Sequence, residues 1–183
     1  VAYRQSSITS LLFRMSAVVD DYDSVTRDDS HLFRTLLGLK WQPSGKSTLE
    51  ALAGMYWRNY SEQNSNSGLS WLINYSLEPT ENWLIKINSA RFSDVSNNEF
   101  TSDSIKQNIV FDINYQYSEQ WKIGINGKIE KTEFNELEQT TELDEAQANL
   151  YVTFGLKKHS QVSLICGNTS QSTSNKAIDY QQS

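Results

Sequence analysis

The stretch STLEALAGMYWRNY, residues 47–60, decides the fold because apolar side chains occupy every second position along it. The alternate positions are Leu49, Ala51, Ala53, Met55 and Trp57. Glu50 and Arg58 fall on the intervening positions. Successive side chains of a β-strand point to opposite faces, whereas those of a helix return to the same face about every 3.6 residues. The stretch is therefore predicted to form a long β-strand with one apolar face and one charged face.

The same alternation recurs along the chain, and connections of two kinds separate its segments. It is clear over 11–17, 69–77, 105–117, 121–129 and 148–156, and looser over 31–41, 82–92 and 161–167. Short connections are predicted near 5–7, 43–46, 78–81, 118–120 and 157–160, and long polar connections near 20–30, 60–67, 93–103, 132–145 and 168–176. This regular alternation of short and long connections indicates one repeated hairpin. It predicts an all-β, antiparallel sheet whose consecutive strands run up and down.

The predicted strands have the dimensions of strands that cross an outer membrane. Strands of about 10 to 12 residues, tilted by about 45°, span roughly 25 Å, the height of the apolar band of a membrane barrel. Only half of the positions in such strands are apolar, so a hydrophobic content of 38% is compatible with a barrel. Aromatic residues gather near the short turns, at Trp41, Tyr75, Trp83, Tyr115, Tyr117 and Trp121, and toward the long connections, at Trp57, Tyr60, Trp71 and Phe92. Two such groups are typical of the two membrane interfaces.

We therefore predict one outer-membrane domain over residues 1–183: a transmembrane β-barrel, or a large fragment of one, truncated at both ends. About nine full strands are expected, with partial strands at both ends. The alternative is a soluble β-sandwich, whose strands also alternate but average only about 5–6 residues. No apolar run reaches the ~18 residues that a transmembrane helix needs.

Because alternate residues of a strand share a face, the sequence pattern assigns many of the charged residues to the face opposite the apolar one. The basic residues predicted to line the lumen are Arg14, Arg34, Lys40, Arg58, Lys86, Lys106, Lys122, Lys128 and Lys157. Only Glu50, Asp112 and Glu130 are acidic on that face, and the long connections hold most of the acidic residues of a chain with net charge −6. Rings of basic side chains favour anions in a pore. The lumen is therefore predicted to bind an anionic solute, with internal pairing of the charges as the open alternative.

Signals for catalysis and for nucleic-acid binding are thin. The chain has two histidines, His31 and His159, and one cysteine, Cys166, which alternates with apolar neighbours. No nucleophile, zinc-binding or phosphate-binding motif is present. We therefore predict that the protein is not an enzyme and that it has no cofactor or metal site. The negative net charge gives no support to a nucleic-acid partner, and the predicted partners are outer-membrane lipid, lipopolysaccharide and an anionic polysaccharide.

Short phrases at the turns carry a resemblance to a known family. An aromatic-x-x-Ser phrase enters a short turn at 3–6, 41–44 and 115–118, and Ser174-Asn175 is followed by Asp179-Tyr180. In these features the chain resembles a family of bacterial outer-membrane β-barrel porins associated with exopolysaccharide or capsule operons. The resemblance implies export of an exopolysaccharide across the Gram-negative outer membrane, and it carries over no catalytic residues. The alternative function is a structural or adhesive barrel whose long acidic loops bind a surface partner.

Overall fold

The computed structural model describes residues 2–4, 6, 8–21, 29–61, 65–95, 103–135, 139–157 and 160–177. All of the regular structure in these ranges is β-strand. The strands are β1 (Ala2–Arg4), β2 (Thr9–Asp20), β3 (Ser30–Ser44), β4 (Ser47–Tyr60), β5 (Asn66–Leu77), β6 (Trp83–Val95), β7 (Asp103–Gln116), β8 (Trp121–Asn135), β9 (Gln139–Lys157) and β10 (Ser160–Ala177). Within the described ranges there is no helix long and apolar enough to cross a membrane.

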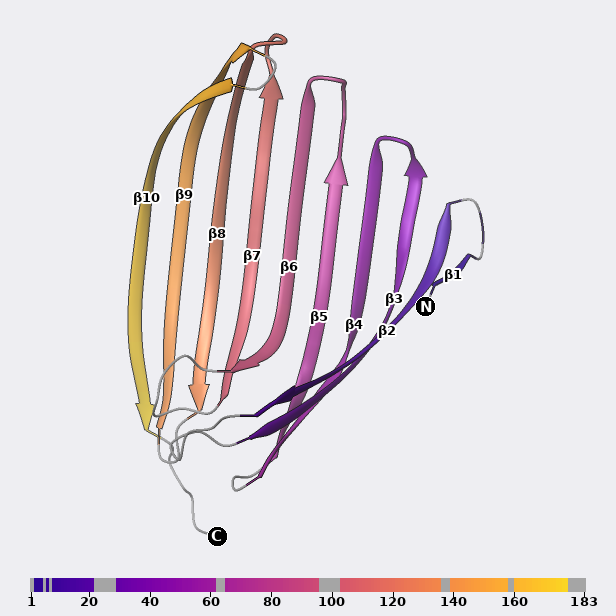
Figure 1. Ribbon diagram of the computed structural model, residues 1–183, viewed down its shortest axis with the longest axis vertical. Coiled ribbons are helices and arrows are strands. Elements are labelled where there is room, and N and C mark those ends of the chain that lie inside the picture. Colours follow the sequence, from indigo (N-terminus) through magenta and orange to yellow (C-terminus); the bar gives the residue numbers. More distant parts are fainter. Residues whose placement is uncertain are drawn as a thin grey trace.

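The strands form a single sheet in sequence order, β1 to β10, and every neighbouring pair is antiparallel. The short connections after β3, β5 and β7 lie at one end of the sheet, and β2, β4, β6 and β8 end at the other (Figure 1). The prediction of an all-β, antiparallel, up-and-down fold is therefore confirmed. In the described ranges the sheet is open, because β10 pairs only with β9 and β1 pairs only with β2.

Several strands are longer than the sequence pattern indicated. The regions 132–145 and 168–176, predicted as long connections, lie mostly in strands, since β8 continues to Asn135, β9 begins at Gln139 and β10 runs to Ala177. These polar residues pair in full ladders, with Glu133 opposite Glu142. The prediction was wrong there because hydrophobic alternation ends before backbone pairing does. A strand that extends beyond its apolar band can remain in the ladder with polar residues on both faces.

The sheet has two faces of opposite character. We call the positions of even-numbered residues in β2–β8 and odd-numbered residues in β9 and β10 the inner face, and the remaining positions the outer face; the register keeps each set on one side. On the outer face, large apolar side chains are exposed, such as Met15 (61%), Leu37 (63%) and Ile129 (59%). Apolar positions of the alternation recognised in the sequence share this face: Leu49, Ala51, Met55, Trp71, Ile73, Phe111, Ile113, Ile123, Leu150, Val152 and Phe154.

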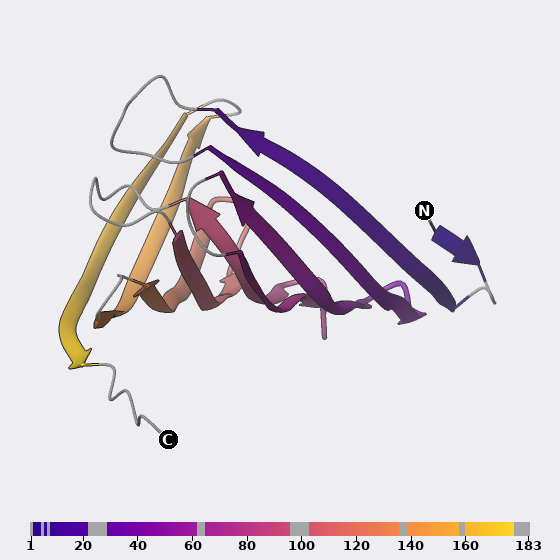
Figure 2. The ribbon, with the colours of Figure 1, turned by 90° about the horizontal axis from the view of Figure 1, so that it is seen from below.

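The inner face holds the buried residues, and the sheet curves around it. Apart from Ser93 and Gly127, the buried residues of the described ranges lie on the inner face: Leu32, Leu36, Leu52, Tyr56, Ser30, Arg58, Ser70, Ser104, Asn114, Gly124 and Thr132. Figure 2 shows the sheet as a trough, in which β2 (indigo) and β10 (yellow) rise on opposite sides of the central strands. Inner-face side chains on strands two apart make contact, as between Arg14 of β2 and Glu50 of β4. The inner face is therefore the concave one.

Two glycines allow β3 and β4 to bend into this trough. A Cβ atom at Gly54 would meet the carbonyl oxygen of Thr35 in β3, and one at Gly38 would meet that of Ala51 in β4. Across the same two strands, Leu36 lies opposite Gly54 and Leu52 lies opposite Gly38. Both leucines are only 2% exposed. Glycine inside a strand typically marks such a close approach of two backbones, and here it makes room for the apolar part of the inner face.

We expect Gly54→Ala to destabilise the fold and Gly45→Ala to leave it unchanged. The added methyl group at residue 54 meets backbone of the neighbouring strand, whereas nothing lies within 4 Å of a Cβ atom at Gly45. Overpacking of this kind costs about 1–3 kcal/mol, and an unobstructed surface change costs within about 0.5 kcal/mol. Urea unfolding in detergent, followed by tryptophan fluorescence, measures the difference. Equal midpoints for the two variants would contradict the close approach at Gly54.

Candidate functional site

The candidate site is the band of charged side chains on the inner face. The register places the predicted basic residues there: Arg14 on β2, Arg34 on β3, Arg58 on β4, Lys86 on β6, Lys106 on β7, and Lys122 and Lys128 on β8. Lys40 of β3 also lies on this face. The side chain of Lys157 lies outside the described residues. Alternation brings these side chains together because period-two positions on paired strands share one side of the sheet.

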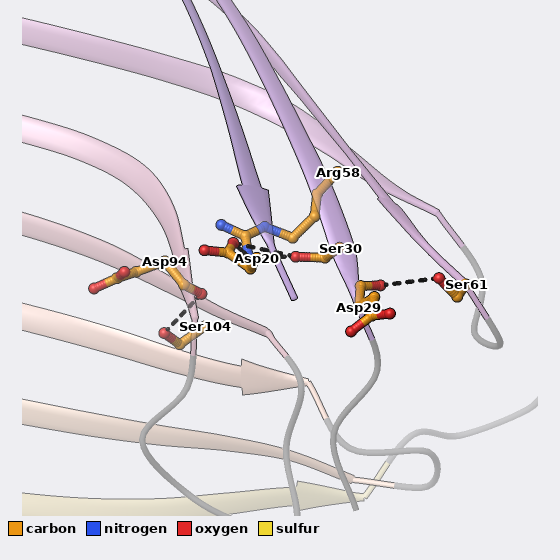
Figure 3. Close-up of polar contacts among 7 residues, drawn as sticks. All are labelled: Asp20, Asp29, Ser30, Arg58, Ser61, Asp94 and Ser104. Carbon is orange, nitrogen blue, oxygen red and sulfur yellow. Dashed lines mark hydrogen bonds and ion pairs between the residues drawn. The ribbon is translucent and has the colours of Figure 1, made fainter. Parts of the chain in front are cut away.

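An ion pair formed by a buried arginine holds the ends of three strands together. Arg58 is 2% exposed, and its Nη1 lies 3.4 Å from Oδ2 of Asp20 at the end of β2. The same Nη1 donates a hydrogen bond of 3.2 Å to Ser30 Oγ, and Ser30 Oγ donates one of 3.3 Å to Asp20. Figure 3 shows these three side chains converging beside the hydrogen bond of 3.5 Å from Ser61 Oγ to the Asp29 carbonyl oxygen. Arg58 is therefore a structural charge at the end of the sheet.

Three more basic residues of the inner face have carboxylate partners. Arg14 Nη2 lies 3.3 Å from Glu50 Oε1, and the Arg14 side chain is 50% exposed. Lys106 Nζ lies 2.7 Å from Asp94 Oδ2 on the neighbouring strand. Lys128 Nζ lies 3.1 Å from Glu130 Oε1 and 4.0 Å from Glu145 Oε1. Some basic residues of the inner face are therefore paired with carboxylates of the protein itself, as the alternative interpretation of the sequence expected.

The charge imbalance predicted for this face is too large. Asp20, Asp94 and Glu145 were assigned to long connections, but they lie in strands and on the inner face. They join the acidic residues recognised from parity, which are Glu50, Asp112 and Glu130. The error has the same cause as the error in strand length, since polar residues beyond the apolar band do not reveal that the strand continues.

Four basic residues of the inner face have no carboxylate at ion-pair distance within the described ranges: Arg34, Lys40, Lys86 and Lys122. Lys40 and Lys86 nevertheless lie directly opposite acidic residues in the register, at Glu50 and Asp112. No acidic residue lies directly opposite Arg34 or Lys122 in the described strands. The positive excess of the inner face is therefore concentrated at these two residues.

Tyr151 organises the surroundings of Lys122. Its hydroxyl donates a hydrogen bond of 2.8 Å to Asp112 Oδ1 on β7, two strands away. The Lys122 ammonium lies 5.8 Å from the centre of the Tyr151 ring. Such a cation–π contact positions the ammonium without neutralising it. Tyr151 falls between the apolar positions of the alternation over 148–156, but a sequence carries no signal for a contact that joins strands two apart.

Within the described strands, the outer face carries aromatic pairs and a charged cluster around Lys131. Aromatic rings pair across strands between Trp83 and Tyr115 (5.0 Å) and between Trp121 and Phe154 (4.6 Å). Lys131 on β8 lies 3.5 Å from Glu133 and 3.1 Å from Glu142. No group of three or more His, Cys, Asp or Glu side chains in the described ranges is arranged to hold a metal ion.

Comparison with protein-family models, with curated proteins and with solved structures finds no match to this chain.

We expect Arg58→Met to destabilise the protein far more than Arg14→Met. Loss of Arg58 removes a fully buried cation and leaves the carboxylate of Asp20, which is 21% exposed, without its partner, a change that costs about 3 kcal/mol. Loss of Arg14 breaks a half-exposed pair and costs less than about 1 kcal/mol. The free energy of unfolding in detergent distinguishes the two variants. Equal losses would mean that the pair of Arg58 and Asp20 is as solvated as the pair of Arg14 and Glu50.

Proposed function

We propose that the protein forms the wall of a β-barrel in the outer membrane of a Gram-negative bacterium. We propose further that its charged interior passes an anionic solute, such as an anionic exopolysaccharide. One observation carries the proposal: exposed apolar side chains cover the outer face, while the buried residues and most charged pairs lie on the inner face. A water-soluble sheet protein has the opposite arrangement, since burial of apolar side chains drives its folding.

The size of the apolar outer face argues for lipid as its solvent. The exposed residues extend from Phe13 on β2 through Ile73 on β5 to Leu164 on β10. Each large apolar side chain left in water forgoes roughly 1.5–3 kcal/mol of burial free energy. Contiguous apolar patches larger than a few hundred Å² mark interaction surfaces. Aromatic pairs such as Trp83 with Tyr115 suit the interfaces of a bilayer, where outer-membrane lipid and lipopolysaccharide are the proposed partners.

A bilayer also requires that the two open edges of the sheet be paired. Backbone amide and carbonyl groups at an unpaired edge have no hydrogen-bond partner in hydrocarbon, so membrane sheets close into barrels. β1 and β10 run in opposite directions, because neighbouring strands alternate through the ten-stranded sheet. Antiparallel closure is therefore possible directly or through an even number of further strands. Closure is part of the proposal.

The unpaired cations support an anionic solute. Arg34 and Lys122 have no acidic residue opposite them, so their charges act on whatever enters the concave side. Low-dielectric walls focus such fields, and basic side chains in a pore favour anions. The paired residues Arg58, Lys106 and Lys128 contribute less, because a nearby carboxylate cancels most of their field.

We expect Ile87→Lys to impair insertion into lipid vesicles and Asn88→Lys to preserve it. Ile87 is 39% exposed on the outer face, and Asn88 is its neighbour on the inner face. A lysine that faces the middle of a bilayer costs about 2–4 kcal/mol. Folded yield in vesicles, read from β-sheet circular dichroism and protease protection, measures the effect. The assignment of the outer face to lipid fails if both variants insert equally well.

In planar bilayers we expect channels formed by the protein to prefer anions at low salt. The preference should weaken at 1 M salt, where the screening length falls to about 3 Å. Lys86→Glu combined with Lys122→Glu should invert the preference, which reversal potentials under a salt gradient measure. Lys131→Gln is the matched control, because Lys131 lies on the outer face of the same strand as Lys122. Cation preference in the unaltered protein, or no response to the double reversal, would contradict anion passage.

A further inference from the structure

A cavity on the concave side brings two arginines together with apolar side chains. Its volume is about 360 Å³, and it lies between β2 and β6. Arg14 and Arg34 contribute the charge, Leu36, Leu72, Ala90 and Phe92 of the inner face contribute apolar walls, and Trp71 of the outer face completes the lining. The volume falls in the range of roughly 300–1,000 Å³ typical of small-molecule sites. We call this feature the arginine cavity.

The two guanidinium groups of the arginine cavity are incompletely compensated. Arg34 has no carboxylate at ion-pair distance within the described ranges, and its Nε is buried without a hydrogen-bond partner. Arg14 and Arg34 line the same cavity, so their like charges repel one another. Arg14 meets Glu50 through Nη2, and its half-exposed side chain keeps further N–H donors available. A second anion would relieve the repulsion between the two arginines.

The apolar walls select the kind of anion. A small inorganic anion gains nothing from Leu36, Leu72 and Phe92, because it would lose hydration without a compensating contact. An anionic group attached to a ring satisfies both parts of the cavity. Arginine forks match carboxylates through paired N–H donors, and the carbon-bound hydrogens of a sugar ring pack against an aromatic or aliphatic wall.

We propose that the arginine cavity is a binding subsite for a carboxylated sugar unit. The carboxylate lies between Arg14 and Arg34, and the ring lies against Leu36, Leu72 and Phe92. This inference rests on the proposed function, because it specifies the anionic polymer that passes along the inner face. It adds that passage includes a stopping point at which one acidic sugar is held, so the solute is recognised as well as attracted.

The test is isothermal titration calorimetry of the full chain, folded in detergent, with three probes. These are a galacturonate trisaccharide, a neutral glucose trisaccharide and inorganic sulfate. The galacturonate trisaccharide should bind at least about tenfold more tightly than either of the other two probes. Arg34→Gln should weaken its binding by at least about tenfold, the scale of a charge-assisted hydrogen bond. Phe92→Leu should weaken its binding several-fold and leave that of sulfate unchanged.

Lys40→Gln is the matched control, because Lys40 is also an inner-face cation without an ion pair but does not line the cavity. Its galacturonate affinity should stay within about twofold of the unaltered value, since only the diffuse field changes. Arg34→Lys keeps the positive charge but loses the paired N–H donors of the guanidinium group. Its galacturonate affinity should lie between those of the unaltered protein and Arg34→Gln. If circular dichroism shows that Arg34→Gln is unfolded, the galacturonate affinities of Arg34→Lys and Arg14→Gln test the subsite instead.

Four results would overturn the subsite: no galacturonate binding, unchanged binding by the arginine variants, equal weakening by Lys40→Gln, or sulfate binding as tight as galacturonate binding. The planar-bilayer measurement separates this failure from that of the proposed function. Anion-selective channels without galacturonate binding would leave passage standing and remove the subsite. Galacturonate binding without anion selectivity would leave the subsite standing and remove passage.

Discussion

The rest of the structure depends on the pairing of long antiparallel strands in one continuous register. Each ladder fixes the side on which every side chain lies, because the side-chain period of a strand is two. The ladders from β2 to β10 keep the two faces separate, so one side collects Leu11, Ile73 and Leu164 and the other collects Arg14, Lys86 and Tyr151. A slip of one residue in any ladder would exchange the two sets from that strand onward.

The curvature of the sheet gives its two faces different surroundings. Gly38 and Gly54 let β3 and β4 approach closely, and Leu36 and Leu52 fill the space opposite them. The concave side consequently has a small apolar centre, although it is also the charged side. Charged side chains gather around this centre, and those on strands two apart come within hydrogen-bonding distance, as Arg14 and Glu50 do. The convex side has no partner within the described chain and keeps its large apolar residues exposed.

The charges of the inner face divide into structural and available ones. Arg58 with Asp20 ties β4 to β2 across β3, and Lys106 with Asp94 ties the neighbouring strands β7 and β6 together, both near the long connections. Arg34 and Lys122 lack such partners and are the groups most able to act on a solute. A single face thus combines pairs that stabilise the sheet with isolated cations whose field is not cancelled, and total charge reveals neither class.

The sequence by itself determined the strand class, the antiparallel order and the face of each residue within the apolar bands, because alternation between positions such as Leu49 and Glu50 is a local property. It did not determine where β8, β9 and β10 end, because backbone pairing continues after the apolar pattern stops. It also could not identify the partners of Arg58 or the walls around Arg34. Those contacts join residues far apart in the chain, and only the register and curvature of the folded sheet bring Asp20 to Arg58 and Phe92 to the cavity of Arg34.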